Sequence, residues 1–362
     1  MTWESDEERR NLADDRDALW GAWPRSGGEV RTEMDNMTPK PGVYTGVDFP
    51  TYRAWDAVNW HTLWRLLEES PAHARYEMAY GTKETEALAF GSLTDFVLLE
   101  PGRFAQEAVI EPEIGEGLAP RRPNKRQIEA KKPSPATIAA IRYWQEFDAK
   151  TAGKIVVARA DYDRVLQIER AVRSAQCKDY IVGGRAQVCI VWVDPATGLL
   201  CKARLDYERY AGMNHYINDL KTSRSAKKEY WKWAIRKYGY DGQLAYYDFG
   251  WKQAVGESSL CSWVVAEKDG LCVVKPYECG EKTLQRGRNI YRRALDKWAE
   301  CVRKNEWPDY GGPEIIELDD WALQEEGIGP DMIRDAPKYK GGPVPEGQEQ
   351  DEFDTFIEGE QA

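Results

Sequence analysis

The chain has 362 residues, of which 50 are Lys or Arg and 61 are Asp or Glu, so its formal net charge is -11. That length allows one large domain with appendages and a substantial hydrophobic core. An acidic balance argues against a protein that coats nucleic acid nonspecifically, so any contact with nucleic acid must be local. The seven cysteines include no Cys-x-x-Cys pair and therefore indicate neither a zinc site nor a secreted disulfide framework.

Composition divides the chain into three predicted parts. Residues 1–40 are charged with few periodic apolar positions, which predicts a partly disordered N-terminal arm. Residues 41–325 are expected to form the folded domain, and residues 326–362 an acidic, disordered tail. No apolar run approaches the roughly 20 residues of a membrane span, and the charged N-terminus is not typical of a signal peptide. We therefore expect a cytoplasmic protein with no membrane partner.

In the first half of the domain, apolar periodicity predicts helices over 62–69, 71–80, 88–99, 138–149 and 160–175. Ser70 and Pro71 strengthen the second start, because serine caps a helix and proline fits its first turn. The helix over 88–99 is strongly apolar, so its lone carboxylate, Asp95, needs a partner if it is buried.

The segment 111–135 is rich in proline, glycine and charge, and it gathers six cations: Arg121, Arg122, Lys125, Arg126, Lys131 and Lys132. One interpretation is a loop that grips the DNA backbone, because phosphate contacts need only flexible Lys and Arg side chains. The other is a solvated, mobile loop. Composition alone leaves both open.

Downstream, apolar and β-branched runs separated by turn residues predict three antiparallel strands over 186–193, 199–206 and 216–221. The second reversal is expected within 208–214. Such strands bring Asp206 and Asp219 close together, and the period of 2 places Lys221 on the same face as Asp219. Leu220 then turns into the core.

This pattern indicates metal chemistry. Two buried carboxylates repel each other unless a cation lies between them, and oxygen ligands with room for water suit Mg²⁺ or Mn²⁺. A lysine beside such a site can position a water or offset charge on a phosphate. The alternative is an exposed strand end whose charges are merely solvated, because Asp-x-Lys is a common sequence.

Residues 226–251 have helical periodicity, and Gln243 and Tyr247 are four apart, so they share a helix face. An amide and a phenol there can bind the attacking water or a phosphate oxygen. Tyr238 and Tyr246 are better explained as packed side chains. The rest of the domain predicts a hairpin over 260–267 and 271–277 and an amphipathic helix over 281–304.

Asp206, Asp219-Leu-Lys221 and Gln243-x-x-x-Tyr247 together resemble the PD-(D/E)XK nuclease core with the Gln-x-x-x-Tyr element of RecB-type nucleases. More closely, the chain resembles the nuclease domain of exodeoxyribonuclease VIII (RecE-type) and its phage relatives. Further segments of the likeness fall in the family's order, at 41–44, 69–73, 91–104 and 306–310.

The resemblance implies an α/β fold with a restriction-endonuclease-like core, in which a central mixed β-sheet is flanked by α-helices. It implies a Mg²⁺-dependent exodeoxyribonuclease, with Mn²⁺ as a substitute, acting on ends of linear double-stranded DNA. Degradation from the 5′ end would leave 3′ single-stranded tails for recombination by a single-strand annealing protein. Family relatives also imply a ring-shaped homo-oligomer and, for a phage-encoded chain, a bacterial host cell.

Carried over residue by residue, Asp206, Asp219 and the Leu220 carbonyl would hold the metal, and Lys221 would handle the nucleophilic water. Gln243 and Tyr247 would lie beside the scissile phosphate. The resemblance also favours the DNA interpretation of the basic loop, through Arg121, Arg122, Lys125 and Arg126.

Two positions depart from the family pattern. Asp95 stands where the family usually has a histidine, and Gln187 stands where it often has a glutamate. Asp95 either replaces the histidine as a metal ligand, which we favour, or is satisfied locally, which would weaken metal binding. Two alternative functions therefore stay open: a catalytically impaired DNA-end-binding scaffold, and a structure-specific or single-strand nuclease.

Overall fold

The computed structural model describes residues 38–81, 85–174 and 176–319. Almost all of the predicted N-terminal arm and the whole acidic tail lie outside these residues. Within the described residues, no helix is long and apolar enough to cross a membrane.

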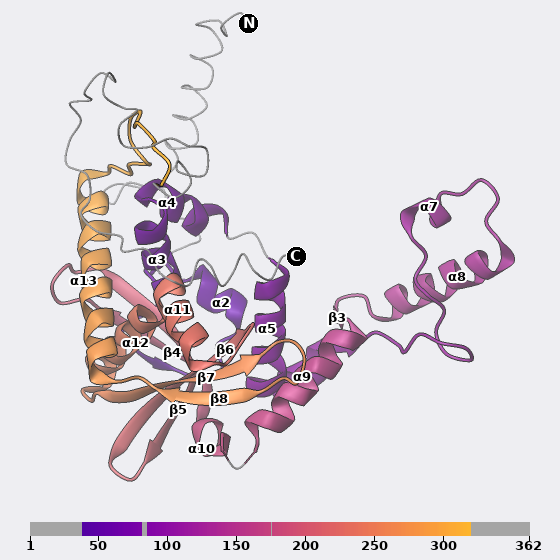
Figure 1. Ribbon diagram of the computed structural model, residues 1–362, viewed down its shortest axis with the longest axis horizontal. Helices are drawn as coiled ribbons and strands as arrows, with labels where there is room; N and C mark the ends of the chain where they lie inside the picture. Colours follow the sequence, from indigo (N-terminus) through magenta and orange to yellow (C-terminus); the bar gives the residue numbers. More distant parts are fainter. Residues whose placement is uncertain (1–37, 82–84, 175, 320–362) are drawn as a thin grey trace, which may run out of the picture.

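The centre of the structure is a six-stranded mixed sheet (Figure 1). Its strands are β1 (Gly42–Tyr44), β4 (Arg185–Val193), β5 (Leu200–Ala211), β6 (Asn214–Ser223), β7 (Ser259–Glu267) and β8 (Val274–Glu278), and they lie in that order. The β6–β7 pair is parallel and the other pairs are antiparallel. The predicted fold class is confirmed: a mixed sheet flanked by helices.

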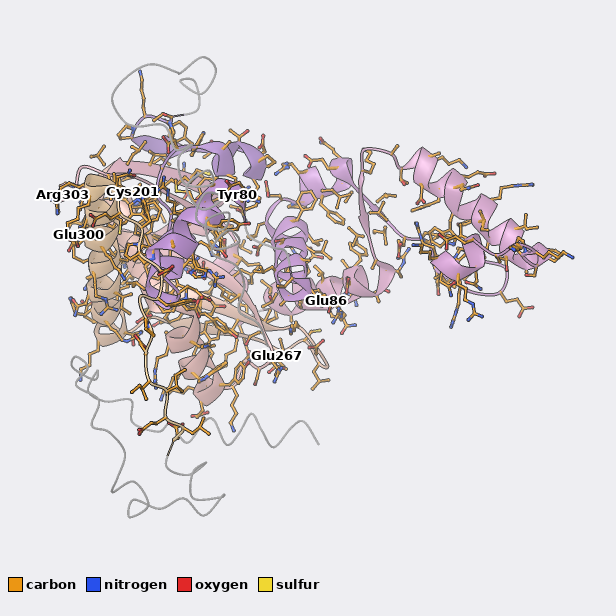
Figure 2. The ribbon with its side chains drawn as sticks, turned by 90° about the horizontal axis from the view of Figure 1, so that it is seen from above. Tyr80, Glu86, Cys201, Glu267, Glu300 and Arg303 are labelled. Carbon is orange, nitrogen blue, oxygen red and sulfur yellow. The ribbon has the colours of Figure 1, made fainter. Side chains whose placement is uncertain are left out.

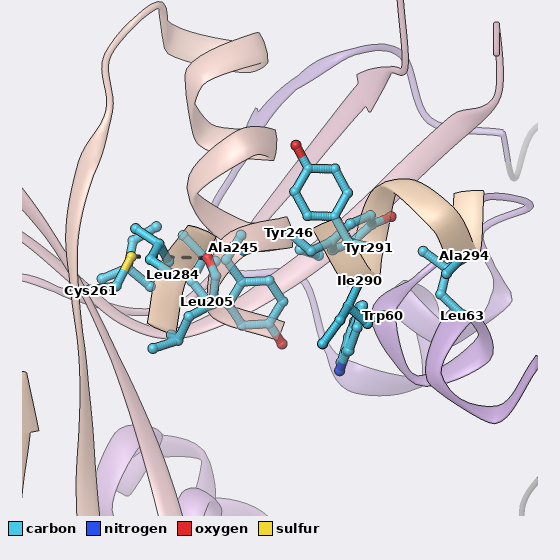
Figure 3. Close-up of a cluster of buried hydrophobic side chains, with 14 of the residues drawn as sticks. Trp60, Leu63, Leu205, Ala245, Tyr246, Cys261, Leu284, Ile290, Tyr291 and Ala294 are labelled. Atoms are coloured by element: carbon cyan, nitrogen blue, oxygen red, sulfur yellow. Dashed lines mark hydrogen bonds between the residues drawn. The ribbon is translucent and has the colours of Figure 1, made fainter. Parts of the chain in front are cut away.

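One face of the sheet carries the larger core. It is covered by α3 (Trp60–Glu68), α11 (Lys228–Tyr238), α12 (Tyr240–Val255) and α13 (Glu281–Lys304). Figure 3 shows the packing, with Trp60 of α3, Tyr246 of α12 and Tyr291 of α13 in one cluster with Leu205 of β5. The bounds of α13 are those that the sequence predicts, because its apolar positions recur with helical spacing.

The opposite face is covered by α5 (Glu86–Leu99) and α9 (Arg159–Val172), which form a second core with β6 and β7. Four shorter helices complete the body: α2 (Phe49–Ala54), α4 (Pro71–Tyr80), α6 (Pro101–Glu107) and α10 (Lys178–Ile181). The predicted start of α4 is confirmed, since the Ser70 hydroxyl accepts a hydrogen bond from the His73 amide at 3.3 Å.

The basic segment belongs to an internal arm, residues 108–157, that projects from the body, as Figures 1 and 2 show. This segment is distinct from the N-terminal arm and is called the arm. The arm begins and ends at a small parallel sheet of β2 (Ala108–Ile110) and β3 (Ile155–Val157). Between them lie α7 (Lys125–Ile128) and α8 (Pro135–Lys150), so the predicted loop is partly helical. Asn124 starts α7 with a reciprocal capping box to Gln127, a local signal that the sequence analysis missed.

Two element boundaries in the site region differ from the prediction. β5 continues to Ala211 and reverses at Gly212, so Asp206 lies within the strand and not at its end. The single helix predicted over 226–251 is broken at Gly239, which has a φ of +66°. A Cβ there would lie 2.4 Å from Trp64, so both the backbone conformation and the close packing require glycine.

The last hairpin also differs. β8 begins at Val274 and not at Leu271, because the turn after β7 is longer than the Lys268-Asp-Gly sequence suggests. Cys272 within this turn has a φ of +49°, which strand pairing does not allow.

Gly287 allows α13 to pack directly on α12, so a larger residue at this position should lower the free energy of unfolding. A Cβ at Gly287 would lie 2.2 Å from the Asp241 carbonyl oxygen, a backbone atom that cannot move aside cheaply. We expect Gly287→Ala to lower the free energy of unfolding by about 1–3 kcal/mol, measured by urea denaturation. In Gly102→Ala on α6, where a Cβ meets open space, stability should be unchanged or higher by up to about 1 kcal/mol. Equal stability of the two variants would contradict this packing.

Candidate active site

The site lies where two central strands of the sheet separate. The β5–β6 ladder runs from Ala211↔Asn214 to Tyr207↔Asn218, and Asp206 and Asp219 are the next residues on the two strands. Beyond this point β5 stays paired with β4, and β6 stays paired with β7. The carboxylates of two neighbouring strands are therefore placed at the opening of a wedge.

Short contacts hold this wedge together. The Asp206 carboxylate accepts a hydrogen bond from the Leu220 amide at 2.9 Å, which replaces a backbone bond that the separated strands no longer make. The Lys221 ammonium lies 2.5 Å from the Asp219 carboxylate. Leu220 turns into the core on the other side, as the alternation of strand residues predicts.

Asp219 is fully buried, and burial together with the negative charge around it outweighs the one nearby ammonium group. Burial, with the nearby Asp206 carboxylate, raises the pKa of Asp219 to about 7 in spite of Lys221. Burial alone would lower the pKa of Lys221, but Asp219 and Asp206 outweigh it and hold this pKa well above its ordinary value. The lysine is therefore an ammonium ion at neutral pH.

Asp95 of α5 belongs to the same cluster. A Cβ at Gly91, one turn earlier on this helix, would lie 3.4 Å from the Thr222 hydroxyl, so α5 runs close against β6. The pKa of Asp95 is held well above its ordinary range by burial and then by the charge of Asp206. The structure thus places Asp95, at the position where the resemblance leads us to expect a histidine, close to the two strand carboxylates, whose charges act on it.

Gln187 lies across the β4–β5 ladder from Asp206, between the pairs Ala186↔Tyr207 and Val188↔Leu205. It is buried and has a φ of +54°, a left-handed conformation that is uncommon for residues other than glycine. Strained backbone of this kind is frequent beside functional sites. No sequence signal predicts it.

The first half of α12 closes the site from the other face of the sheet. The Gln243 amide donates a hydrogen bond to the Tyr247 hydroxyl at 2.8 Å, so the predicted shared helix face is confirmed. Burial and then the charges of Asp219 and Asp206 raise the pKa of Tyr247 well above its ordinary value, which puts this phenol beside the carboxylates.

Tyr240 is a site residue that the sequence analysis missed. The Lys221 ammonium lies 5.4 Å from the centroid of its ring, within cation–π range. Tyr240 is three residues before Gln243 on the same helix, so the spacing that singled out Tyr247 also points to it.

The donor set fits a divalent cation held by oxygen. The Asp219 carboxylate is buried with Oδ1 free of any hydrogen bond, and Asp206 and the Leu220 carbonyl supply further oxygen atoms. These are ligands that Mg²⁺ and Mn²⁺ prefer. In the described part of the chain, however, no three His, Cys, Asp or Glu side chains already surround a common point, so Asp95, Asp206 and Asp219 are not a closed cage.

The cations predicted to bind DNA lie on the arm. Arg122 is used within it: the guanidinium pairs with Asp148 at 2.8 Å and stacks over Trp144 at 4.3 Å. Arg121, Lys125 and Arg126 are exposed, and Lys125 has a distant partner in Glu129 at 3.9 Å. Their contact with DNA stays a prediction.

The sheet, its flanking helices and the Asp206, Asp219 and Lys221 cluster define a protein of the PD-(D/E)XK nuclease class. Residues 61–318 match the family described as "PDDEXK-like domain of unknown function (DUF3799)", and the chain belongs to this family. The closer relation to exodeoxyribonuclease VIII is not established by this match. No curated protein sequence matches the chain.

Several solved structures are similar to the chain, among them the following two. One is a candidate exonuclease from Eubacterium rectale, with 14% identity and a TM-score of 0.46 over 83% of this chain and 99% of that chain. The other is the protein SSO0001, with 16% identity and a TM-score of 0.25 over 48% of this chain and 72% of that chain.

Metal binding should stabilise the fold, because a cation relieves the repulsion among the buried carboxylates. We expect saturating Mg²⁺ or Mn²⁺ to raise the midpoint of thermal unfolding by roughly 2–5 °C. The shift should disappear in Asp219→Asn and shrink in Asp95→Ala if Asp95 is a ligand. It should also be larger at pH 8 than at pH 6, because protons compete for a carboxyl group whose pKa is about 7.

Asp248→Asn is the matched control. Asp248 is a buried carboxylate of α12 outside the site, where it accepts a hydrogen bond from the Ser259 amide at 2.7 Å. An asparagine oxygen can still accept that bond, so the control should keep the full metal-induced shift. If neither Mg²⁺ nor Mn²⁺ changes the midpoint of thermal unfolding of the wild-type protein, the proposed metal site is contradicted.

Proposed function

We propose that the protein is a Mg²⁺-dependent exodeoxyribonuclease that degrades linear double-stranded DNA from the 5′ end. The observation that carries the proposal is the placement of Asp206, Asp219 and Lys221 at one point, where β5 and β6 separate. Two oxygen ligands beside an ammonium ion suit hydrolysis of a phosphodiester, which needs charge stabilisation and a positioned water.

Each side chain has a defined part in this reaction. Asp206, Asp219, the Leu220 carbonyl and Asp95 would hold the metal, which when bound polarises the phosphate and stabilises the leaving 3′ oxygen. Lys221 is held as an ammonium ion, so it orients the attacking water by donating a hydrogen bond and offsets negative charge on the phosphate.

Gln243 and Tyr247 act on the substrate from α12. Their mutual hydrogen bond fixes the amide and phenol on one side of the wedge, and each keeps the capacity to bind a phosphate oxygen. A phenol whose pKa is raised stays protonated and can donate a hydrogen bond to that oxygen.

Contact with DNA must be local on a chain with a net charge of -11. The exposed cations of the arm, Arg121, Lys125 and Arg126, are suited to holding the duplex backbone away from the body. The 5′ to 3′ polarity, the ring-shaped homo-oligomer and the supply of 3′ tails to an annealing protein in phage recombination rest on the resemblance to exodeoxyribonuclease VIII.

A DNA-end-binding scaffold that no longer cuts is the second candidate. Asp95 in place of histidine and the open arrangement of the three carboxylates favour it. The intact Lys221 and Gln243–Tyr247 contacts favour the enzyme, because a scaffold has no need of them. A structure-specific or single-strand nuclease differs from the first proposal only in its substrate.

Digestion of labelled DNA tests the proposal. With Mg²⁺, linear duplex should lose its 5′ label as mononucleotides, whereas covalently closed duplex should stay intact. Lys221→Ala should lower kcat by roughly 100- to 1000-fold, because one donor to the developing charge is removed.

Lys232→Ala, an exposed lysine on α11, is the matched control and should cut as the wild type does. Cleavage of single strands alone would favour the structure-specific nuclease. Folded protein that binds duplex ends but cuts nothing with Mg²⁺ or Mn²⁺ would favour the scaffold and rule out the exonuclease.

A further inference from the structure

Beside the candidate active site, α2 and the end of α4 enclose an open groove of about 470 Å³. It is lined by Phe49, Pro50, Arg53, Ala54, Met78, Ala79, Tyr80 and Gly81. Two of its aromatic rings are unusually exposed, at 49% for Phe49 and 61% for Tyr80. Figure 2 labels Tyr80, which is the last residue of α4.

The aromatic surface is larger than these two rings. Tyr76, which is 52% exposed, packs against Tyr80 with ring centroids 4.8 Å apart. Exposed rings of this size cost free energy in water unless a partner covers them. The groove therefore presents flat apolar surfaces that suit the faces of other rings.

Positive charge lies close to one of these rings, Phe49. The Arg53 guanidinium is 5.9 Å from the centroid of Phe49, and the Arg204 guanidinium is 5.5 Å from it. Arg53 is exposed, so its charge is available to a ligand in the groove. Aromatic rings interleaved with guanidinium groups are the usual surface for stacked bases and their phosphates.

Beneath this groove, one face of β5 runs toward the candidate metal site, and its side chains there are buried, with Lys202 3% and the Arg204 side chain 9% exposed. Lys202, Arg204 and Asp206 occupy every second position of β5, so they point to the same side of the sheet. Lys202 holds the end of α2 by donating to the Tyr52, Arg53 and Trp55 carbonyls at 2.9, 3.1 and 2.6 Å. Asp206, at the other end of the row, is in the catalytic wedge.

Arg204, in the middle of this row, contacts the groove and the end of α5, the helix that carries Asp95. It stacks on Phe49 and pairs with Glu100, the residue that ends α5, at 3.1 Å. Its charge also reaches Asp95. Arg204, which contacts the groove at Phe49, and Asp206 are two strand positions or about 7 Å apart, so the groove and the wedge lie within a few nucleotides of each other.

We propose that this groove binds single-stranded DNA next to the position of cleavage. Base faces are free to stack on Phe49 and Tyr80 only in a single strand, since in a duplex they are covered by neighbouring bases. The groove thus holds an unpaired strand while its phosphodiester lies in the wedge. This assignment rests on the proposed nuclease function, because it takes the wedge to be the place of hydrolysis.

Binding of a fluorescein-labelled oligothymidine, followed by anisotropy in EDTA so that no hydrolysis occurs, tests the proposal on the full chain. We expect the double variant Phe49→Ala/Tyr80→Ala to bind roughly 10- to 100-fold more weakly than wild type, because two stacking platforms are lost. Arg53→Gln should reduce the slope of log affinity against log salt by about 0.7, as for one lost phosphate contact.

Both tests have internal controls. Arg53→Gln keeps the backbone carbonyl that Lys202 holds, so α2 should stay in place. Tyr210→Ala removes an equally exposed ring near the other end of β5 and should leave oligothymidine binding unchanged. Thermal unfolding identifies any variant that has lost its fold.

The outcomes separate this proposal from the proposed function. Wild-type binding that is unchanged in both groove variants, or no wild-type binding of oligothymidine, overturns the groove assignment even if the protein cuts duplex DNA. Weaker binding in the groove variants supports it, even if no Mg²⁺-dependent cleavage is found. In that case the proposed nuclease function is wrong, whereas the groove is still a binding site for single-stranded DNA.

Discussion

The separation of β5 from β6 at Asp206 and Asp219 is the constraint on which the site depends. Parting two central strands leaves backbone donors without partners, and the Asp206 carboxylate satisfies one of them at Leu220. The strands can part because each remains paired on its other side, β5 with β4 and β6 with β7. The parallel β6–β7 pair thus supports the site, although none of the proposed site residues lies on β7.

The electrostatics of the wedge follow from the same geometry. Three carboxylates, Asp95, Asp206 and Asp219, share a partly or fully buried space with one ammonium group, Lys221. α5 packs on one side of the sheet and α12 on the other, so the three carboxylates come from elements that the two cores hold in place. A buried excess of negative charge is costly for stability and useful for binding a cation.

Local patterns predicted much of the fold. Helices α4 and α13 begin and end where capping and apolar spacing place them, and period-2 alternation placed Asp219 and Lys221 together. The end of β5 is set by the two-residue turn at Gly212 and Met213, a local signal that the strand prediction did not use. The break at Gly239 depends on tertiary packing against Trp64, which no short sequence window contains.

The parts of the site that the sequence did not reveal have the same origin. The backbone of Gln187 is strained because of its place in the sheet. The contacts of Arg204 with Phe49 and Glu100 exist only because α2 and α5 meet around it in the fold. Tyr240 is the exception, since its helical spacing from Gln243 was visible in the sequence. Long-range contacts decide which of many charged or aromatic residues surround one point.

The most direct test of the account is to locate the metal by anomalous diffraction from crystals grown with Mn²⁺. An anomalous peak within coordination distance of the Asp206 and Asp219 carboxylates, about 2.0–2.3 Å, would confirm that the strand wedge is a metal site. A peak elsewhere in the molecule, or a wedge in which Lys221 still pairs with Asp219 and no metal is bound at saturating Mn²⁺, would contradict it.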